Sequence, residues 1–257
     1  MTETITSTHN SRIRALRKLR ERKEREEQQL FMAEGEDMLH AALREHAAPQ
    51  AVFSVPDPPP RLAALLGELP PQIERVTVAP EALAAAGSLG SGSRVIGVWR
   101  LPDIASAPVP QEPGPVLYLH DVADPGNVGT TLRSAQAFGA ARVVLSPRTA
   151  DPFGPKAVRA SMGAVFAQPV SRADFGSARG GRRAIALVPG AGRPLRDVGL
   201  EGAVLFALGS ERAGLPEAVV ASCEEIAHVP VDHGGADSLN VAMAATLCLY
   251  EYRATHA

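Results

Sequence analysis

The chain has 257 residues, and 45% of them are hydrophobic, which is enough for the packed core of one large domain or two ordinary ones. No apolar run approaches the roughly 20 residues that a membrane helix needs, and the first residues lack the apolar stretch of a secretion signal, so we expect a cytoplasmic protein with no membrane segment. The formal net charge of −2 would exclude a nucleic-acid partner if the charge were evenly spread, but it is not.

The basic residues concentrate in one segment near the N-terminus, "SRIRALRKLRERKER", residues 11–25. It holds eight Arg or Lys against two Glu, so eight minus two leaves +6. Ile13, Leu16 and Leu19 recur at three-residue spacing and would anchor one face of a helix, which leaves the basic side chains projecting together. A solvated helix with Glu–Arg pairs is the alternative. We predict phosphate contacts from Arg12, Arg14, Arg17 and Lys18.

Two domains are predicted on either side of a proline-rich linker. Residues 1–100 alternate short apolar runs with helical patterns, as in a small α/β unit, and residues 101–115 carry five prolines without periodicity. Residues 116–257 contain six apolar runs that look like strands covered on both faces of a mainly parallel sheet. The six runs are "VLYLHDV", "ARVVLSP", "AVFAQPV", "RRAIALVP", "GAVLFALG" and "EIAHVPV".

The last segment, "DSLNVAMAATLCLYEYR", predicts a helix with Ser238 as its cap. Residues 239–250 are apolar almost all round, so we expect this helix to be buried on more than one side, by a second subunit among the options.

The stretch "DPGNVGTTLRSAQAFGA", residues 124–140, resembles a nucleotide-binding loop after a strand but lacks both known glycine fingerprints, G-x-G-x-x-G and G-x-x-x-x-G-K-[ST]. A Rossmann-type oxidoreductase is therefore disfavoured. With a helix starting near Val128, Asn127 lies in the preceding turn and Arg133 further along, at the same end of the sheet. Gly126 and Gly129 are expected to turn the chain so that Asn127 is placed.

Two more loops follow predicted strands. "LFALGSERAGLP" carries Gly209 and Glu211, and "HVPVDHGGADSLNVAMAA" carries Ser238 and Asn240. Glycines there allow the backbone to approach a flat ligand, while Pro230 and the pair at 234–235 are expected to fix a rigid turn. The single cysteines and the histidines show no ligand spacing, so we expect no metal site.

In this order and setting, the three loops resemble motifs 1 to 3 of the SpoU (TrmH-like) RNA 2′-O-ribose methyltransferases of the SPOUT class. The patterns are N-x-G-x-x-x-R, G-x-E-x-x-G and P-x-x-x-x-x-x-S-L-N-V, and the match covers residues 116–253. The front part, with its basic helix, strand and "EG", resembles the family's substrate-binding domain of L30e-like fold, in a form commoner among enzymes that modify rRNA. Arg212 departs from the pattern, since many members carry a small residue after the motif 2 glutamate.

The resemblance implies an α/β fold in which a C-terminal trefoil-knot domain follows a smaller L30e-like domain. It implies S-adenosylmethionine as cofactor, bound mostly by backbone groups at Leu208, Gly209, Val229, Ser238 and Leu239, and a homodimer formed through the last helix. It also implies that Arg133 acts beside the ribose hydroxyl, with Asn127, Glu211, Ser238 and Asn240 as positioning residues. A guanidinium stays protonated, so a phosphate clamp suits Arg133 better than the role of base.

The function expected from this resemblance is methylation of a ribose 2′-hydroxyl in RNA, with rRNA of the 23S type favoured. Two alternatives stay open at this point, a tRNA methyltransferase and a non-catalytic RNA-binding protein of the same fold. The nucleotide and base that are modified do not follow from the sequence.

Overall fold

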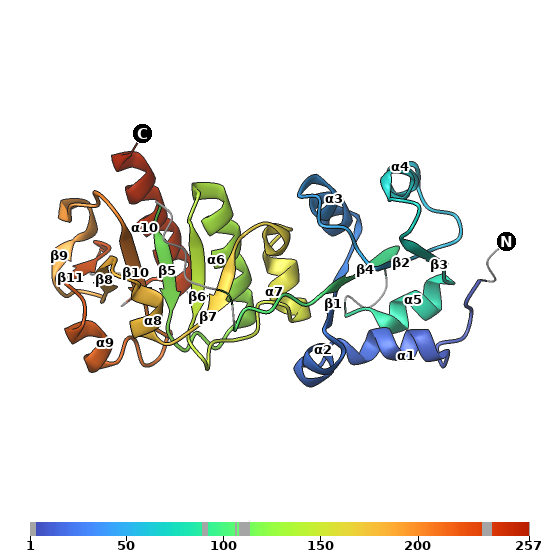
Figure 1. Ribbon diagram of the computed structural model, residues 1–257, viewed down its shortest axis with the longest axis horizontal. Coiled ribbons are helices and arrows are strands. Elements are labelled where there is room, and N and C mark those ends of the chain that lie inside the picture. The colour runs from blue at the N-terminus through green and yellow to red at the C-terminus, as the bar shows by residue number, and fades with distance from the viewer. Residues whose placement is uncertain (1–3, 89–91, 106, 108–113, 233–237, 257) are drawn as a thin grey trace. The chain divides into compact units, whose positions relative to one another are not determined.

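The computed structural model describes residues 4–88, 92–105, 107, 114–232 and 238–256. Contacts divide the chain into two compact units (Figure 1). The N-terminal unit comprises Met1–Pro102 and Asp151–Phe166, and the C-terminal unit comprises Asp103–Ala150 and Ala167–Ala257. The predicted division at 1–100, 101–115 and 116–257 differs from this one in two respects, because 151–166 packs with the first unit and residues from Asp103 onward are grouped with the second. Seven of the fifteen residues of the predicted linker, 106 and 108–113, lie outside the described residues, so the linker stays a prediction.

The N-terminal unit is built on a four-stranded sheet in the order β1-β4-β2-β3, in which β4 pairs antiparallel with β1 and β2, and β2 pairs parallel with β3. Its elements are α1 (Ser11–Lys18), α2 (Arg22–Gln28), β1 (Leu30–Glu34), α3 (Glu36–Arg44), β2 (Ala51–Ser54), α4 (Pro60–Glu68), β3 (Glu74–Thr77), α5 (Pro80–Ala86) and β4 (Val95–Arg100), followed later in the chain by α7 (Pro155–Ala160) and the 3-10 helix η1 (Ala164–Phe166).

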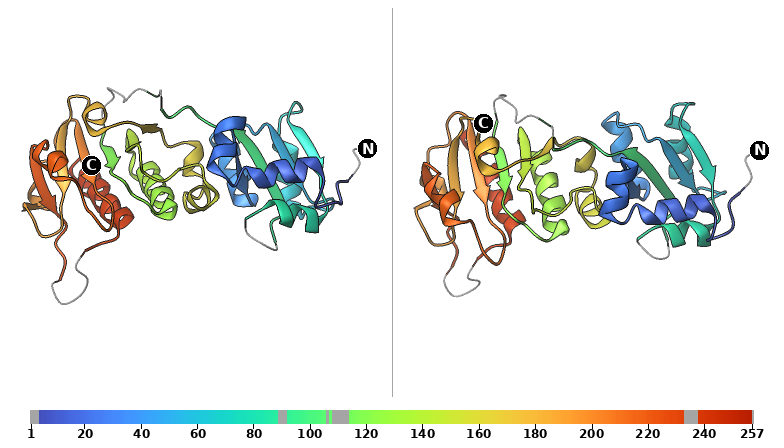
Figure 2. Two further views of the ribbon diagram at one scale, coloured as in Figure 1. Left: turned by 90° about the horizontal axis from the view of Figure 1, so that it is seen from below. Right: turned by 60° about the horizontal axis from the view of Figure 1, so that its bottom comes forward.

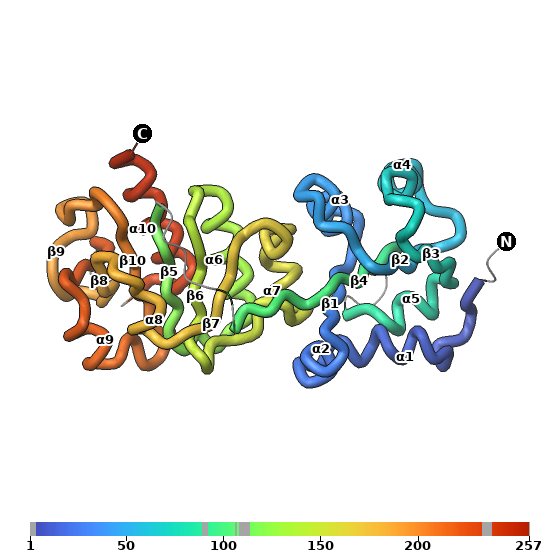
Figure 3. Tube along the Cα trace, in the orientation of Figure 1, coloured from blue at the N-terminus to red at the C-terminus, as the bar shows by residue number. Residues whose placement is uncertain are grey.

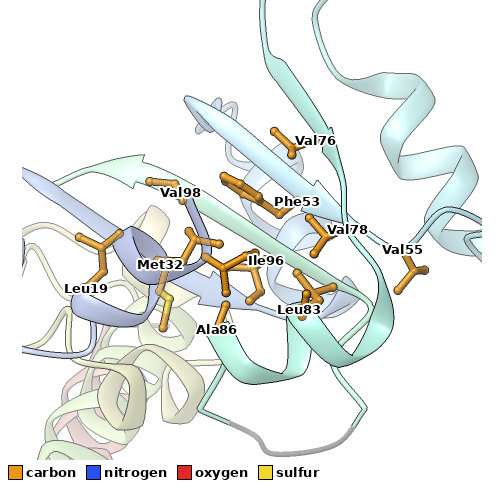
Figure 4. Packing of buried hydrophobic residues seen from close by; sticks show 13 residues of the cluster. Leu19, Met32, Phe53, Val55, Val76, Val78, Leu83, Ala86, Ile96 and Val98 are labelled. Atoms are coloured by element: carbon orange, nitrogen blue, oxygen red, sulfur yellow. The ribbon is translucent and has the colours of Figure 1, made fainter. Parts of the chain in front are cut away.

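One apolar cluster of this unit joins α1 and α5 to the sheet (Figure 4). Ile13 and Leu16 of α1, with Leu19 just after it, are at most 3% exposed and pack with Leu83 of α5 and Ile96 of β4. The three-residue spacing in the sequence therefore marked the buried face correctly. The basic segment forms two helices because it breaks at residues 19–21, where the Arg20 guanidinium donates to the carbonyls of Ala85 and Ala86 at the end of α5.

Residues 151–166 join this unit through aromatic rings and one buried ion pair. Phe153 lies 5.1 Å from Phe31, and Phe166 lies 4.7 Å from Trp99, measured between ring centroids. Arg25 is 3% exposed, forms a salt bridge with Asp151 and donates to two backbone carbonyls of the α1–α2 turn. Arg25 is one of the eight basic residues of the N-terminal segment, but it is buried in the core and is not available to RNA.

The C-terminal unit holds a seven-stranded sheet in the order β7-β6-β5-β10-β8-β11-β9, and its pairings are parallel throughout the described residues. Figure 3 shows β5 beside β10, although the two strands are far apart along the chain. The elements are β5 (Val116–Leu119), α6 (Pro125–Phe138), β6 (Arg142–Leu145), β7 (Val170–Arg172), α8 (Phe175–Arg179), β8 (Arg183–Leu187), β9 (Arg193–Pro194), the 3-10 helix η2 (Leu195–Asp197), β10 (Val204–Leu208), α9 (Glu217–Ala221), β11 (Glu225–His228) and α10 (Val241–Thr255).

Helices cover both faces of this sheet, as its continuously apolar strands require. Helices α6 and α10 pack side by side on one face (Figure 2), and α8 and α9 contribute to the apolar cluster on the other. Five of the six predicted strands are present. The run 164–170 is wrong as a strand, because Ala164–Phe166 forms η1 and β7 begins at Val170.

The cause lies just before that run. The Ser161 hydroxyl donates to the Val158 carbonyl at 2.6 Å, and Gly163 adopts a φ of +97°, so the chain turns instead of extending. A short apolar run has no periodicity that separates a buried strand from a buried helical turn. None of the described helices has the length and apolar character to cross a bilayer.

Candidate active site

Three loops meet at one edge of the C-terminal sheet because they follow parallel strands, of which β5 and β10 are neighbours and β11 is separated from β10 by β8. One follows β5 and enters α6, one follows β10, and one follows β11 and enters α10. In a parallel sheet the carboxyl ends of the strands share an edge, which is the usual place for a ligand. A cavity of about 410 Å³ lies there, lined by the loops after β8, β10 and β11 and by the start of α10.

Asn127 occupies its position because Asp124 caps α6. The Asp124 carboxylate accepts from the backbone N–H groups of Gly126 at 2.5 Å and Asn127 at 3.4 Å, and Pro125 occupies the first helical position. The helix therefore begins at Pro125, three residues before the predicted start. Gly126 and Gly129 lie inside it, so the turn role predicted for them is wrong. The Asp-Pro pair was the available signal of the true start.

Three predicted site residues form one hydrogen-bonded chain. The Asn240 side-chain oxygen accepts from the Ala242 backbone N–H at 2.9 Å, which leaves the Asn240 amide nitrogen to donate to the Asn127 oxygen at 3.0 Å. The Asn127 amide nitrogen then donates to the Glu211 carboxylate. Each amide accepts a hydrogen bond at its oxygen and donates one from its nitrogen, which fixes its orientation. The hydrogen bonds therefore run in one direction, from α10 to the loop after β10.

Asn240, not Ser238, caps the last helix. Its side chain accepts from the backbone N–H groups of Ala242 and Met243, and α10 begins at Val241. Ser238 is exposed and lines the cavity. The predicted cap was wrong because both residues are good caps, and only the backbone path before α10 decides between them. The glycine pair at 234–235 lies outside the described residues.

Arg133 stands apart from this hydrogen-bonded chain. It lies on the exposed side of α6, and within the described part of the structure its guanidinium forms neither a hydrogen bond nor a salt bridge. The buried side of the same helix carries Val128, Leu132 and Ala135, each fully buried. The predicted inward stripe is thus present, and Arg133 is left with five free donors facing solvent.

All five residues predicted to contact a cofactor line the same cavity, namely Leu208, Gly209, Val229, Ser238 and Leu239. Gly209 is required by its surroundings, because a Cβ there would collide with the backbone of Gly214 and Leu215. The loop between them is closed by a hydrogen bond of 2.9 Å from the Gly214 N–H to the Ser210 carbonyl. One wall of the cavity, 187–190, was not predicted, because its only signal in the sequence is its place at the end of a buried strand.

A second polar cluster fixes the turn after β5. The Arg148 guanidinium, followed by the Ser146 hydroxyl, holds the pKa of Asp121 below its usual range by hydrogen bonding to the carboxylate. Asp121 itself has a φ of +53°, a conformation that few side chains tolerate. Burial, with the charge of Asp121 next, raises the pKa of Tyr118 to about 12, so its hydroxyl stays neutral. These contacts hold the chain that leads into Asp124.

The predicted RNA-contacting residues divide into two kinds on α1. Arg12 forms a salt bridge with Glu74, and Lys18 forms one with Glu24 at 3.4 Å. Arg14 and Arg17 are exposed and, among the residues that the structure describes, have no acidic partner. Arg14 and Arg17 are one helical turn apart, on the same side of α1. No group of three or more His, Cys, Asp or Glu side chains suited to a metal ion occurs within the described ranges.

Comparison with known proteins decides the family. The family model for the SpoU rRNA Methylase family matches residues 114–250, more than half of the chain. The chain belongs to the SpoU family. A second model, for the MRM3-like substrate binding domain, matches residues 10–97, which lie in the N-terminal unit.

Two of the matches reported for this SpoU chain span nearly its full length, and a third spans about two thirds of it. The chain is 28% identical over 254 residues to the 23S rRNA (guanosine(2553)-2′-O)-methyltransferase RlmP of Bacillus subtilis, covering 97% of this chain and 98% of the relative. It is 31% identical over 192 residues to the 23S rRNA (uridine(2479)-2′-O)-methyltransferase of Streptomyces viridochromogenes, covering 69% of this chain and 66% of the relative. The AdoMet-bound rRNA methyltransferase from Sinorhizobium meliloti matches with a TM-score of 0.84 at 29% identity, covering 98% of both chains.

Proposed function

We propose that this SpoU protein transfers a methyl group from S-adenosylmethionine to a ribose 2′-hydroxyl of ribosomal RNA of the 23S type. The observation that carries the proposal is that Glu211, which lines the cavity, is also the end of the Asn240–Asn127–Glu211 hydrogen-bonded chain. A cofactor pocket and a fixed set of polar side chains therefore share one loop. Two relatives, one matched over nearly its full length and one over about two thirds of it, carry names with this same reaction on 23S rRNA.

The cavity suits the proposed cofactor in size and in chemistry. Its volume of about 410 Å³ lies in the range of small-molecule sites, roughly 300–1,000 Å³. Gly209 lets the backbone of this loop pack closely against Gly214 and Leu215, where a Cβ would collide, and the residues of this tight turn line the cavity. Bound there, S-adenosylmethionine supplies an electrophilic methyl group on a positively charged sulfur. Leu208, Gly209, Val229, Ser238 and Leu239 would hold it.

Side chains next to the cavity would orient the RNA and supply positive charge. Asn127 is fixed from both sides, by Asn240 and Glu211, and presents a rigid polar edge beside the cavity. Arg133 is protonated, exposed and unpaired within the described residues, which suits it to bind a phosphate of the RNA in a bidentate manner. Positive charge beside the target ribose lowers the proton affinity of its hydroxyl and favours attack in line with the methyl group.

RNA is held in this proposal by the N-terminal unit as well. Arg14 and Arg17 on α1 are the predicted contacts that carry unneutralised charge, while Arg12 and Lys18 are already paired. The two named relatives modify a guanosine and a uridine, so family membership leaves the base open. A ribosomal substrate places the reaction in the cytoplasm.

We also propose a homodimer formed through α10. Met243, Leu247 and Tyr250 recur at four- and three-residue spacing on one side of this helix and are 61%, 36% and 54% exposed in the single chain. Exposed apolar side chains that form a stripe on one helix are typical of a surface that is covered by another protein chain. Leu247→Glu is expected to halve the mass measured by light scattering, and a wild-type chain that is already monomeric would refute the dimer.

The test of the reaction uses purified full-length protein, S-adenosylmethionine with a labelled methyl group, and separate samples of 23S rRNA, 16S rRNA and tRNA. Label is expected in 23S rRNA alone, at a ribose identified by mapping 2′-O-methylated positions with and without the gene. Label in tRNA would reassign the substrate, and cofactor binding without transfer to any RNA would refute the enzyme. Arg133→Lys that retains full methylation at saturating RNA would refute the bidentate clamp.

A further inference from the structure

Arg212 lines the cavity, and its side chain is a part of the predicted second motif for which the sequence indicated no role. It follows Glu211 at the tip of the turn Ser210–Gly214. The turn is closed by two hydrogen bonds to Ser210, from the Gly214 N–H at 2.9 Å and from the Ala213 N–H at 3.3 Å. A φ of +66° at Gly214 completes it. Arg212 is therefore presented by a rigid turn.

The guanidinium of Arg212 has no protein partner among the described residues. Its acidic neighbour in sequence, Glu211, already accepts a hydrogen bond from the Asn127 amide. Arg212 is exposed and lines the cavity, and of the described residues that line it, Arg212 carries the one permanent positive charge. Its five N–H donors are thus available to a ligand at the cavity.

The positive charge of Arg212 suits an anion that is not part of the cofactor. The sulfonium of S-adenosylmethionine is positive, so a second cation deep in the pocket would oppose its binding, whereas a cation at the rim faces whatever approaches from solvent. The RNA must bring a ribose to that rim, and each internal ribose has a phosphate on both sides. A guanidinium matches a phosphate in fork geometry and charge.

We propose that Arg212 binds a backbone phosphate next to the target nucleotide, as a second clamp besides Arg133. This rests on the proposed function. Arg133 on α6 and Arg212 are tied to one another through the Asn127–Glu211 hydrogen bond, so a strand held by both would have its ribose fixed against the cavity. The alternative anion, the carboxylate of S-adenosylmethionine itself, is separated from this proposal by the test.

The test measures binding of Arg212→Ala, Arg212→Lys and wild type to the RNA fragment that the wild-type chain methylates, by fluorescence anisotropy from about 50 to 200 mM KCl. Arg212→Ala is expected to weaken RNA binding about tenfold and to reduce the slope of log Kd against log salt by about 0.7, the value for one phosphate of a single strand. Arg212→Lys keeps the slope and loses part of the affinity. KM for RNA rises, and the Kd for S-adenosylmethionine in calorimetry stays within twofold.

Arg196→Ala is the matched control, because it removes the same charge from the same unit at a side chain that is 72% exposed and outside the cavity lining. It is expected to leave RNA affinity and slope unchanged. A loss of S-adenosylmethionine affinity in Arg212→Ala with an unchanged salt slope would assign Arg212 to the cofactor and overturn the proposal. No change in either affinity would overturn it too. If the wild-type chain methylates no RNA, the proposed function fails instead.

Discussion

Asn240 joins the stability of the last helix to the geometry of the site, and substitution can separate the two. Its oxygen caps α10, and its amide nitrogen holds Asn127 at 3.0 Å. Loss of a cap costs about 1 kcal/mol, and loss of an exposed hydrogen bond adds less than about 1 kcal/mol. For a chain of this size 1 kcal/mol lowers Tm by about 2–4 °C, so Asn240→Ala should lower Tm by roughly 2–8 °C and reduce activity.

Asn240→Asp keeps the cap, since a carboxylate accepts the same backbone N–H groups, but it has no proton to donate to Asn127. The Asn127 amide would then turn its nitrogen toward the new carboxylate and release Glu211. We expect an unchanged Tm and a fall in kcat of about 100-fold, the usual effect of a small misplacement of reacting groups.

The measurements are calorimetric Tm and methyl transfer to 23S rRNA at saturating substrates. Asp174→Ala is the matched control, because it removes the cap of α8, where the carboxylate accepts from the Ser177 N–H at 2.8 Å, away from the cavity. It should lower Tm and leave kcat unchanged. Wild-type kcat in Asn240→Asp would refute the positioning role of the hydrogen-bonded chain, and an unchanged Tm in Asn240→Ala would refute the cap.

Three further outcomes are expected. Gly209→Ala should abolish S-adenosylmethionine binding in calorimetry, because its Cβ would collide with the Gly214 backbone; wild-type affinity would mean that this loop is no part of the cofactor site. Asp151→Ala leaves the buried Arg25 without its carboxylate and should cost about 3–5 kcal/mol in urea unfolding, so a loss below about 1 kcal/mol would contradict the buried pair. Burial raises the pKa of Cys223 to about 11, so its alkylation rate in the native protein should still be rising at pH 10, whereas a plateau near pH 9 would show an ordinary thiol.

The sheet of the C-terminal unit was readable from the sequence because its strands are buried on both faces and leave continuous apolar runs. Five of the six runs are strands, and the three motif loops follow β5, β10 and β11 as expected. The run 164–170 failed because a strand and a buried 3-10 turn demand the same apolar side chains. There the φ of +97° at Gly163 decided the outcome.

The spacing of the motifs, the buried face of α1 and the set of residues at one edge of a parallel sheet could be read from the amino-acid order, because they follow from periodicity and local chemistry. Which of these residues touch became known from the folded chain. The fold joined Asn127, Glu211 and Asn240 in one directed chain of hydrogen bonds and left Arg133 and Arg212 without a partner among the described residues. It also neutralised Arg12 and Lys18 and buried Arg25 against Asp151. Partners this far apart along the chain are chosen by packing, which no local pattern records.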